Sequence, residues 1–277
     1  MDIKGCKDKG RMIMLTTAAD SRKKFRGFKS ERSKAVRQCL VEENKAVREM
    51  IRAWEEFDIG KGTYREDGQI DRLMEVVSSI RYVARDVEKF NIMMQLFEHE
   101  KEFGTKAGKF LSALINCCPE DGITIRTDHL ERSISDLGEE NTKNIRVFGE
   151  RGVPWLGKKM KDGRITVLGE GSVYVGFGMA GGTIEVFGNV MDCAGTNLSG
   201  GRIIVHGNAG SLLGHCMSGG TIEVSGDAYK IVGGGGVGKC MQGGEIRIGG
   251  RYRLDDYDPP KRGRIFNKGK LIFDRSL

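Results

Sequence analysis

The chain has 277 residues, of which 39% are hydrophobic and 30% charged, and its formal net charge is +7 at pH 7. No apolar run approaches the ~20 residues that a membrane-spanning helix requires, and the opening segment lacks the apolar core of a secretory signal. The composition therefore argues against a membrane protein and predicts a cytoplasmic one, whose seven cysteines are reduced thiols.

Charge divides the chain into three parts. Residues 1–29 carry nine Lys and Arg against three Asp and Glu, and they are predicted to form a disordered basic tail. Residues 30–140 carry 17 basic and 23 acidic side chains, and residues 141–277 carry 19 and 12. Basic surface attracts acidic partners, but no nucleic-acid-binding signature is present. We therefore expect the opposite charges to help dock the two halves or their protein partners, rather than nucleic acid.

Apolar residues at helical spacing predict a helical hairpin domain over residues 30–118. The first helix is predicted from Ser30, its N-cap, to Phe57, with this stripe: Val36, Leu40, Val47, Met50, Ile51, Trp54 and Phe57. The second is predicted from about Ile70 to Phe103, with this stripe: Leu73, Val77, Ile80, Ala84, Val87, Phe90, Met94 and Phe97. A shorter helix follows over Thr105–Asn116. The hairpin is also a candidate surface for homo-oligomer formation.

A 19-residue repeat begins after this region. Its units start at Gly157, Gly176, Gly195 and Gly214, and a fifth starts at Gly238, 24 residues later. Two apolar columns stand two residues apart in each unit: Ile165, Ile184, Ile203, Ile222 and Ile246, with Val167, Val186, Val205, Val224 and Ile248. This spacing places both columns on one face of a short strand. Stacked units of this kind predict a right-handed parallel β-helix of about 19-residue coils over residues 119–277, which makes the fold α+β by segments.

Other columns complete the predicted coil. Two more are apolar: Met160, Met179, Leu198, Met217 and Met241, and Tyr174, Cys193, Leu212 and Ile231. One is polar and is predicted to point outward: Arg164, Thr183, Arg202, Thr221 and Glu245. Asn189, Asn208 and Asp227 predict a turn ladder of left-handed residues that bond their own backbone. The segment "DGITIRTDHLERSISDLG" is predicted to supply the first strand and cap.

The stretch "IVGGGGVGKCMQGG" contains G-x-x-x-x-G-K, from Gly233 to Lys239. A phosphate loop requires a hydroxyl after the lysine and a helix after the hydroxyl. Cys240 stands in place of the hydroxyl, and the residues that follow alternate as in a strand. We therefore predict a five-residue insertion that bulges from one coil. The alternative is a ligand or nucleotide loop, which would be built from Gly233, Gly234, Gly235, Gly236 and Lys239.

Cys216 and Cys240 share one column of adjacent coils, so their α-carbons are predicted to lie near ~5 Å apart. That separation suits a disulfide or two metal ligands. Two soft ligands do not complete a four-ligand site, so two inert stacked thiols are predicted here. The side chain of the neighbouring His215 is expected to point the other way.

The remaining candidates have simple structural interpretations. Cys117 and Cys118 follow a helix and are predicted to pack rather than to perform redox chemistry. His206 lies in an outward column and is predicted to be a surface histidine. A capping loop accounts for Asp128, His129 and Glu131. Because G-x-S-x-G is also absent, no catalytic residue is predicted.

Three segments carry a resemblance to a known family: "GGTIEVFGN", "SGGRIIVHGNAG" and "CMSGGTIEVSGDA". They resemble the GXGXG-repeat β-helix of the glutamate synthase large subunit, of its stand-alone archaeal homologues, and of one subunit of formylmethanofuran dehydrogenase. The resemblance covers about Asn141 to Gly250. It implies a non-catalytic spacer that holds the other subunits of a redox or amidotransferase complex in register.

On this resemblance no cofactor is expected on this chain, because it lacks the amidotransferase and flavin-binding regions of a complete glutamate synthase. Flavin, iron–sulfur or molybdopterin groups would lie on partner subunits. The resemblance leaves two complexes open, one like glutamate synthase and one like formylmethanofuran dehydrogenase. A third hypothesis is an autonomous enzyme or ligand-binding protein that uses the loop from Gly233 to Gly236.

Overall fold

The computed structural model describes residues 44–58, 68–228 and 235–275. The chain divides into two compact units, Met1–Lys45 and Ala46–Leu277, and the first lies almost wholly outside the described residues. The predicted disordered tail and the first part of the predicted first helix, including Ser30, therefore cannot be compared with the structure. In the described part of the chain, no helix is both long enough and apolar enough to cross a membrane.

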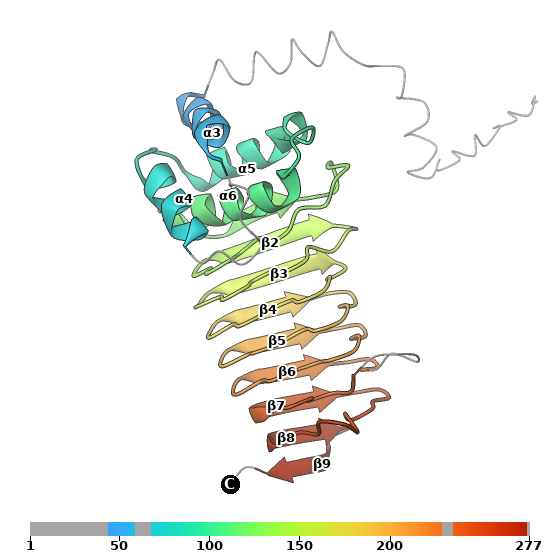
Figure 1. The fold of residues 1–277 in the computed structure, drawn as a ribbon. Helices are drawn as coiled ribbons and strands as arrows, with labels where there is room; N and C mark the ends of the chain where they lie inside the picture. The colour runs from blue at the N-terminus through green and yellow to red at the C-terminus, as the bar shows by residue number, and fades with distance from the viewer. Residues whose placement is uncertain (1–43, 59–67, 229–234, 276–277) are drawn as a thin grey trace, which may run out of the picture. The chain divides into compact units, whose positions relative to one another are not determined.

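The second unit begins with four α-helices (Figure 1). They are α3 (Lys45–Glu56), α4 (Gln69–Ser78), α5 (Ala84–Met93), which continues into the 3₁₀ turn η1 (Met94–Leu96), and α6 (Phe103–Cys117). Trp54 is fully buried and lies among four phenylalanine rings at centroid distances of 5.1–6.3 Å: Phe90, Phe97, Phe103 and Phe110. The Trp54 indole N–H donates to Glu100 Oε1 at 2.7 Å. The described members of the apolar stripes thus lie in the helical core or pack against it, whereas Val36 and Leu40 lie outside the described residues.

The prediction of one continuous helix from Ile70 to Phe103 is wrong. α4 ends at Ser78, whose hydroxyl donates to the carbonyl of Glu75 at 2.7 Å, a bond that competes with the helix ladder. α5 begins after Val83, whose N–H donates to the carboxylate of Asp86 at 3.2 Å. Local side-chain bonds therefore divide the predicted stripe, and a group of short helices replaces the two-helix hairpin.

Nine strands follow in one sheet, and their spatial order is their order in the chain (Figure 1). They are β1 (Ile123–Arg126), β2 (Asn144–Gly149), β3 (Arg164–Gly169), β4 (Thr183–Val186), β5 (Arg202–Val205), β6 (Thr221–Val224), β7 (Gln242–Ile248), β8 (Arg262–Asn267) and β9 (Lys270–Arg275). Strands β1 to β8 are parallel, and β9 folds back antiparallel on β8. The predicted parallel solenoid of 19-residue coils, with its first strand in "ITIR", is confirmed.

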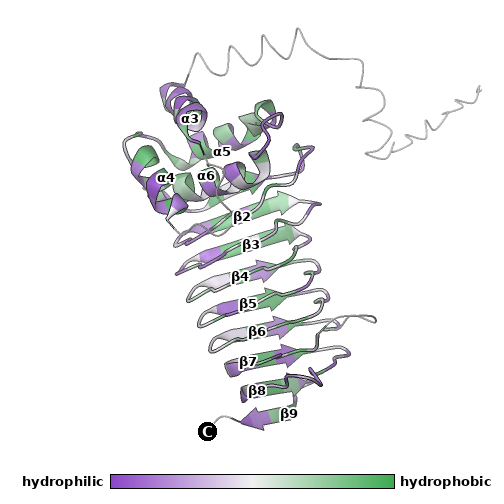
Figure 2. Cartoon of the chain, in the orientation of Figure 1, coloured by the Kyte–Doolittle hydropathy of each residue, from purple (hydrophilic) through white to green (hydrophobic). Residues whose placement is uncertain are grey.

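The inward columns are buried as predicted. Every residue of the isoleucine and methionine columns is fully buried, and those of the valine column are at most 4% exposed. Successive isoleucines pair in register across the strands, for example Ile184 with Ile203. Figure 2 shows polar residues at the start of β2 and β3 and apolar residues further along each strand. The alternation of the sequence therefore becomes one dry interior shared by all the coils.

The turn ladder forms, but not by the predicted mechanism. Asn189, Asn208 and Asp227 are absent from the residues with positive φ. Instead, the Asn189 side-chain oxygen accepts from Asn208 N–H, and that of Asn208 accepts from Asp227 N–H, each at 2.8 Å. The prediction of left-handed residues bonding their own backbone is thus wrong. Each side chain satisfies the backbone of the next coil, because stacking brings that donor closer than any local one.

Helix α5 covers the first edge of the sheet. Asn91 is fully buried, its amide donates to the carbonyl of Arg126 at 3.0 Å, and its oxygen accepts from Arg126 N–H at 2.8 Å. Glu88 accepts from Thr124 N–H at 2.8 Å. These bonds supply β1 with the partners that a further strand would offer, so this edge is closed to pairing.

The glycine column permits a direct test of the coil geometry. Gly214 has φ +66°, and a Cβ added there would lie 2.6 Å from Ile246 Cδ1 in the next coil. We expect Gly214→Ala to lower the free energy of unfolding by about 1 kcal/mol for the left-handed backbone and by about 1–3 kcal/mol more for overpacking. Gly269→Ala is the matched control, because Gly269 has φ +77° with nothing within 4 Å of an added Cβ. Equal urea midpoints for the two variants would contradict the close contact.

Candidate functional site

The glycine stretch only partly forms the predicted bulge. Gly233 and Gly234 lie outside the described residues, but Gly235 and Gly236 belong to the regular coil. The Gly235 carbonyl accepts from Leu212 N–H at 3.1 Å, the same coil-to-coil bond that Ser211 makes one coil earlier. The insertion therefore ends before Gly235, and a bulge reaching Gly236 is wrong.

The hydrogen-bond register of this coil also corrects the predicted apolar column of Tyr174, Cys193, Leu212 and Ile231. Gly238 N–H donates to the carbonyl of Leu213 at 2.8 Å, so the residue stacked against Leu212 is Gly236. The repeat spacing predicts Ile231 there, and Ile231 lies outside the described residues. The prediction fails because a column continued at 19 residues runs into the insertion.

A carboxylate already occupies one backbone amide of the candidate loop, that of Gly236. Asp255 is buried and accepts from the N–H groups of Gly236 at 2.9 Å, Tyr257 at 3.1 Å and Asp258 at 2.8 Å. Burial opposes ionisation of Asp255, but these amide bonds and the charge of Lys239 outweigh it, so the pKa of Asp255 lies below its ordinary value. An ionised Asp255 both occupies Gly236 N–H and repels a phosphate at this position.

We therefore expect calorimetry to detect no ATP or GTP binding tighter than about millimolar. Lys239→Ala should leave the melting temperature nearly unchanged, because its backbone carbonyl, rather than its side chain, bonds Cys216 N–H at 2.8 Å. Micromolar, Mg²⁺-dependent binding that Lys239→Ala abolishes would restore the nucleotide-loop hypothesis.

His215, Cys216 and Cys240 meet at one corner of the solenoid. The two cysteines form a disulfide with their α-carbons 4.8 Å apart, close to the predicted separation. The expectation of two separate thiols is not met, and the expectation that His215 points away is wrong. One ring nitrogen of His215 and both sulfurs lie within 4.8 Å of one another. Cys216 adopts φ +52°, and this left-handed corner redirects the chain, so side chains do not alternate there as they do in a strand.

Burial, followed by the positive charge of Lys239, lowers the pKa of His215 below its ordinary value. The imidazole is consequently neutral at pH 7. Among the described residues, this is the one group of three His, Cys, Asp or Glu side chains whose ligand atoms converge in this way.

The other predicted candidates are engaged in packing. His206 is exposed, stacks on Phe187 with ring centroids 4.4 Å apart, and bonds Glu185 at 3.0 Å, so the surface prediction is confirmed. His129 Nε2 lies 3.0 Å from the carbonyl oxygen of Asn91. The carboxylate oxygen Oδ2 of Asp128 lies 3.9 Å from Arg126 Nη1. Among the described residues, neither histidine belongs to a group of three converging metal-ligand side chains.

The vicinal cysteines are packing residues as predicted. Cys118 is buried, and the Cys117 thiol donates to the carbonyl of Met74 at 3.7 Å. Burial raises the pKa of both thiols, which keeps them protonated and weakly nucleophilic.

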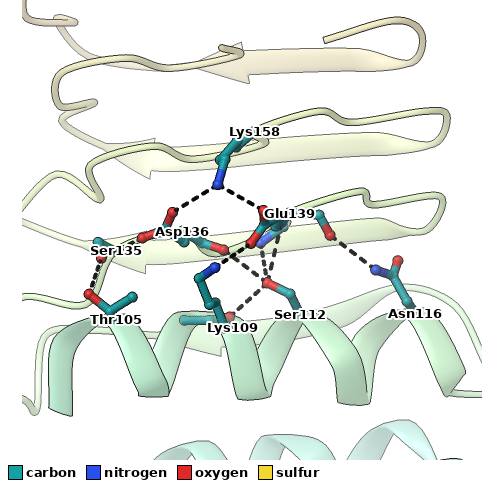
Figure 3. A network of polar contacts seen from close by, with 10 residues as sticks. Thr105, Lys109, Ser112, Asn116, Ser135, Asp136, Glu139 and Lys158 are labelled. Carbon is teal, nitrogen blue, oxygen red and sulfur yellow. Dashed lines mark hydrogen bonds and ion pairs between the residues drawn. The ribbon is translucent and has the colours of Figure 1, made fainter. Parts of the chain in front are cut away.

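A buried charge cluster, not predicted from the sequence, lies where α6 meets the first coils. We define it as Lys109, Asp136, Glu139 and Lys158. Figure 3 shows Lys109 reaching up from α6 and Lys158 reaching from the opposite side, both toward Glu139. Lys158 Nζ lies 2.9 Å from Glu139 Oε1 and 3.8 Å from Asp136 Oδ1, and Lys109 Nζ lies 3.4 Å from Glu139 Oε2.

Neighbouring polar groups complete the junction. Ser112 on α6 donates from its hydroxyl to the carbonyl of Gly108 at 2.7 Å and accepts from Gly138 N–H at 2.8 Å (Figure 3). Asn116 donates to the carbonyl of Glu139 at 3.1 Å. The only sequence signal is Lys109 within the apolar run "KFLSALI", and no local pattern identifies its partner. The closed arrangement acts as a clamp between α6 and the solenoid.

The cluster predicts a pH-dependent effect. Burial raises the pKa of Asp136, since it outweighs the Ser135 hydrogen bond and the charge of Lys158. A raised carboxyl pKa contributes stability below the unfolded-state pKa, and this contribution is lost as pH rises through the folded-state pKa. Asp136→Asn should therefore be at least as stable as the parent chain at neutral pH. That advantage should shrink as pH falls toward the ordinary carboxyl range. Urea midpoints measured against pH test this, and an advantage that grows in acid would contradict it.

Three large side chains on the outside of the coils are exposed. Leu168 in β3 is 40% exposed, and Phe187, which directly follows β4, is 51% exposed. They follow the paired residues Val167 and Val186, so they are neighbours across adjacent coils. Met191 is 60% exposed and lines a hollow of about 540 Å³ with Arg151 and Glu170 among others.

Comparison of this chain with protein-family models, curated proteins and solved structures gives no match.

Proposed function

We propose that this protein is a non-catalytic docking subunit of a multi-subunit oxidoreductase or amidotransferase similar to glutamate synthase. In this function the solenoid is a rigid spacer, and the chemistry belongs to flavin, iron–sulfur or molybdopterin groups on partner subunits. The proposal rests on the GXGXG-like repeat segments and on one surface feature of the structure.

That feature is the strip of exposed side chains formed by Leu168, Phe187 and His206 on three successive coils. Phe187 and Leu168 are each at least 40% exposed, and the His206 ring stacks on Phe187. Exposed side chains that stacked coils hold in place lose little conformational entropy on binding, because their backbone is already ordered. The strip therefore supports docking of another protein along the coil-stacking direction.

The chemistry-bearing groups outside the disulfide corner support the same proposal. Asp255 is held by three backbone amides, and the buried charge cluster is paired internally. A catalytic carboxylate or lysine needs access to substrate, whereas these side chains are largely buried and engaged with partners in the chain itself.

The proposal is tested by isolating the tagged full-length chain from its own cells under native conditions. We expect a stoichiometric partner whose absorbance or metal content identifies a flavin, iron–sulfur cluster or molybdopterin. Phe187→Glu should abolish recovery of that partner without lowering the melting temperature, since the residue is half exposed. Tyr257→Glu is the matched control, because Tyr257 is 94% exposed and lies outside the strip.

Recovery of a partner without a redox or amidotransferase group would count against the proposed class of complex. A lone monomer with its own turnover would favour the autonomous enzyme. A molybdopterin partner would favour the complex similar to formylmethanofuran dehydrogenase over the one similar to glutamate synthase.

A further inference from the structure

The corner formed by His215, Cys216 and Cys240, here called the thiol–imidazole cluster, is held in place by coil stacking itself. Cys216 N–H donates to the carbonyl of Lys239 at 2.8 Å, and the two cysteine α-carbons lie 4.8 Å apart. The ring nitrogen and both sulfurs lie within 4.8 Å of one another. The three groups are thus brought together by the backbone of two adjacent coils.

Backbone propensity does not explain the cysteines. The equivalent corners of earlier coils are Lys159, Gly178 and Asn197, with φ of +53°, +63° and +56°. Cys216 and Cys240 take the same left-handed conformation, with φ of +52° and +46°. This conformation favours glycine and asparagine over other residues. Two cysteines in succession at such a position point to a role for their sulfurs.

We propose that the thiol–imidazole cluster is a redox-gated binding site for a soft divalent cation of the zinc class. In the reduced state two cysteine sulfurs and one imidazole nitrogen supply three ligands. Zn²⁺ binds such ligands tetrahedrally, and bonds of about 2.3 Å to sulfur and 2.0–2.1 Å to nitrogen place the ligand atoms about 3.6–3.8 Å apart. The three ligand atoms lie within 4.8 Å of one another, so the side chains start close to this spacing.

The cluster supplies three protein ligands, so it leaves one of the four coordination positions of the cation unfilled. Asp255 and Asp258 lie nearby in the next coil, but neither belongs to the cluster, and the Asp255 carboxylate is already held by three amides. The cluster therefore leaves the fourth position of the tetrahedron to an exchangeable ligand such as water. Three protein ligands and one exchangeable position distinguish this site from a closed structural zinc site.

The disulfide and the metal exclude each other, because a bonded sulfur pair has no thiolate to offer. In this proposal a peroxide oxidises the two thiolates to the disulfide. The two metal-bound thiolates give up two electrons and form the S–S bond, while hydrogen peroxide takes two electrons and two protons to become two waters, and the cation leaves. A small dithiol reverses the step: it supplies two electrons and two protons and becomes a disulfide. Metal binding then displaces the two thiol protons.

The experiment uses the full-length chain carrying Cys6→Ser and Cys39→Ser, because those cysteines lie outside the described residues. The protein is reduced with dithiothreitol, desalted without oxygen and titrated with Co²⁺. We expect stoichiometric binding, with thiolate-to-cobalt charge-transfer absorption and the visible bands of tetrahedral Co²⁺, both lost on addition of Zn²⁺. Hydrogen peroxide should then release the Zn²⁺ to a chromogenic chelator, and peptide mapping should recover the Cys216–Cys240 disulfide.

Variants assign the ligands. Cys216→Ser and Cys240→Ser should each remove the peroxide-triggered release. His215→Ala should weaken Co²⁺ binding on the order of tenfold or more, since loss of even an outer partner costs that much, yet it should leave the disulfide able to form. Cys193→Ser is the matched control, because Cys193 is a buried free cysteine at another left-handed corner, and it should bind like the parent chain. Circular dichroism confirms that each variant is folded.

Two results would overturn the proposal. One is a disulfide that the dithiol does not reduce in the folded chain. The other is a reduced pair that binds no Co²⁺, or binds it equally well after Cys216→Ser. Either result would leave Cys216–Cys240 as a structural cross-link alone.

Discussion

Replacing Ile203 by Asp should unfold the solenoid. Ile203 is fully buried in β5 and pairs with Ile184 and Ile222 on the adjacent coils. An ionised carboxylate there has no partner in the apolar interior, so the free energy of unfolding should fall by more than about 4 kcal/mol. Loss of the cooperative thermal transition, followed by circular dichroism, is the expected result.

The neighbouring residue supplies the control. Ile204 is only partly buried, and its column holds Glu185 and Glu223 on the adjacent coils. Ile204→Lys places a charge between two carboxylates on the outer face and should therefore change the free energy of unfolding by less than about 1 kcal/mol. If the two variants melt alike, the assignment of the inward column is incorrect.

Glu139→Gln should destabilise the junction between α6 and the solenoid strongly. Lys109 is 3% exposed, and its ion pair with Glu139 at 3.4 Å is its only one among the described residues. Without the carboxylate, a buried ammonium remains uncompensated, and breaking a buried pair in this way costs about 3–5 kcal/mol. Urea unfolding of the full-length chain measures the loss.

Lys109→Met distinguishes an unpaired charge from a general packing defect. It keeps an unbranched side chain only one atom shorter, and Glu139 retains Lys158 at 2.9 Å. We expect this variant to lose much less stability than Glu139→Gln. Removing the Lys109 ammonium leaves Glu139 paired with Lys158, so no buried charge is left without a partner. Equal losses for the two variants would show that volume, not charge, holds the junction.

The 19-residue period by itself determines most of the solenoid. In a stacked repeat the spatial neighbour of a residue is the residue one coil away, so tertiary contacts are already visible as sequence columns. This is why the burial of Ile203 and the approach of Cys216 to Cys240 could both be predicted. The period carries this information because strand pairing keeps equivalent residues in register.

The tertiary structure decided what the period does not encode. The helical stripe after Ile70 gave no sign of its break, because the serine and aspartate bonds that end α4 and start α5 leave the apolar spacing intact. The link between Lys109 and Glu139 joins two different kinds of element, so no repeat column connects them.

The corner at Cys216 was also beyond the sequence pattern. Alternation assumes extended backbone, and the left-handed φ there turns His215 toward the sulfurs instead of away from them. Likewise, four consecutive glycines do not say where a five-residue insertion ends. The hydrogen bonds from Leu212 N–H to the Gly235 carbonyl and from Gly238 N–H to the Leu213 carbonyl decide it, because they set the register of this coil against the preceding one.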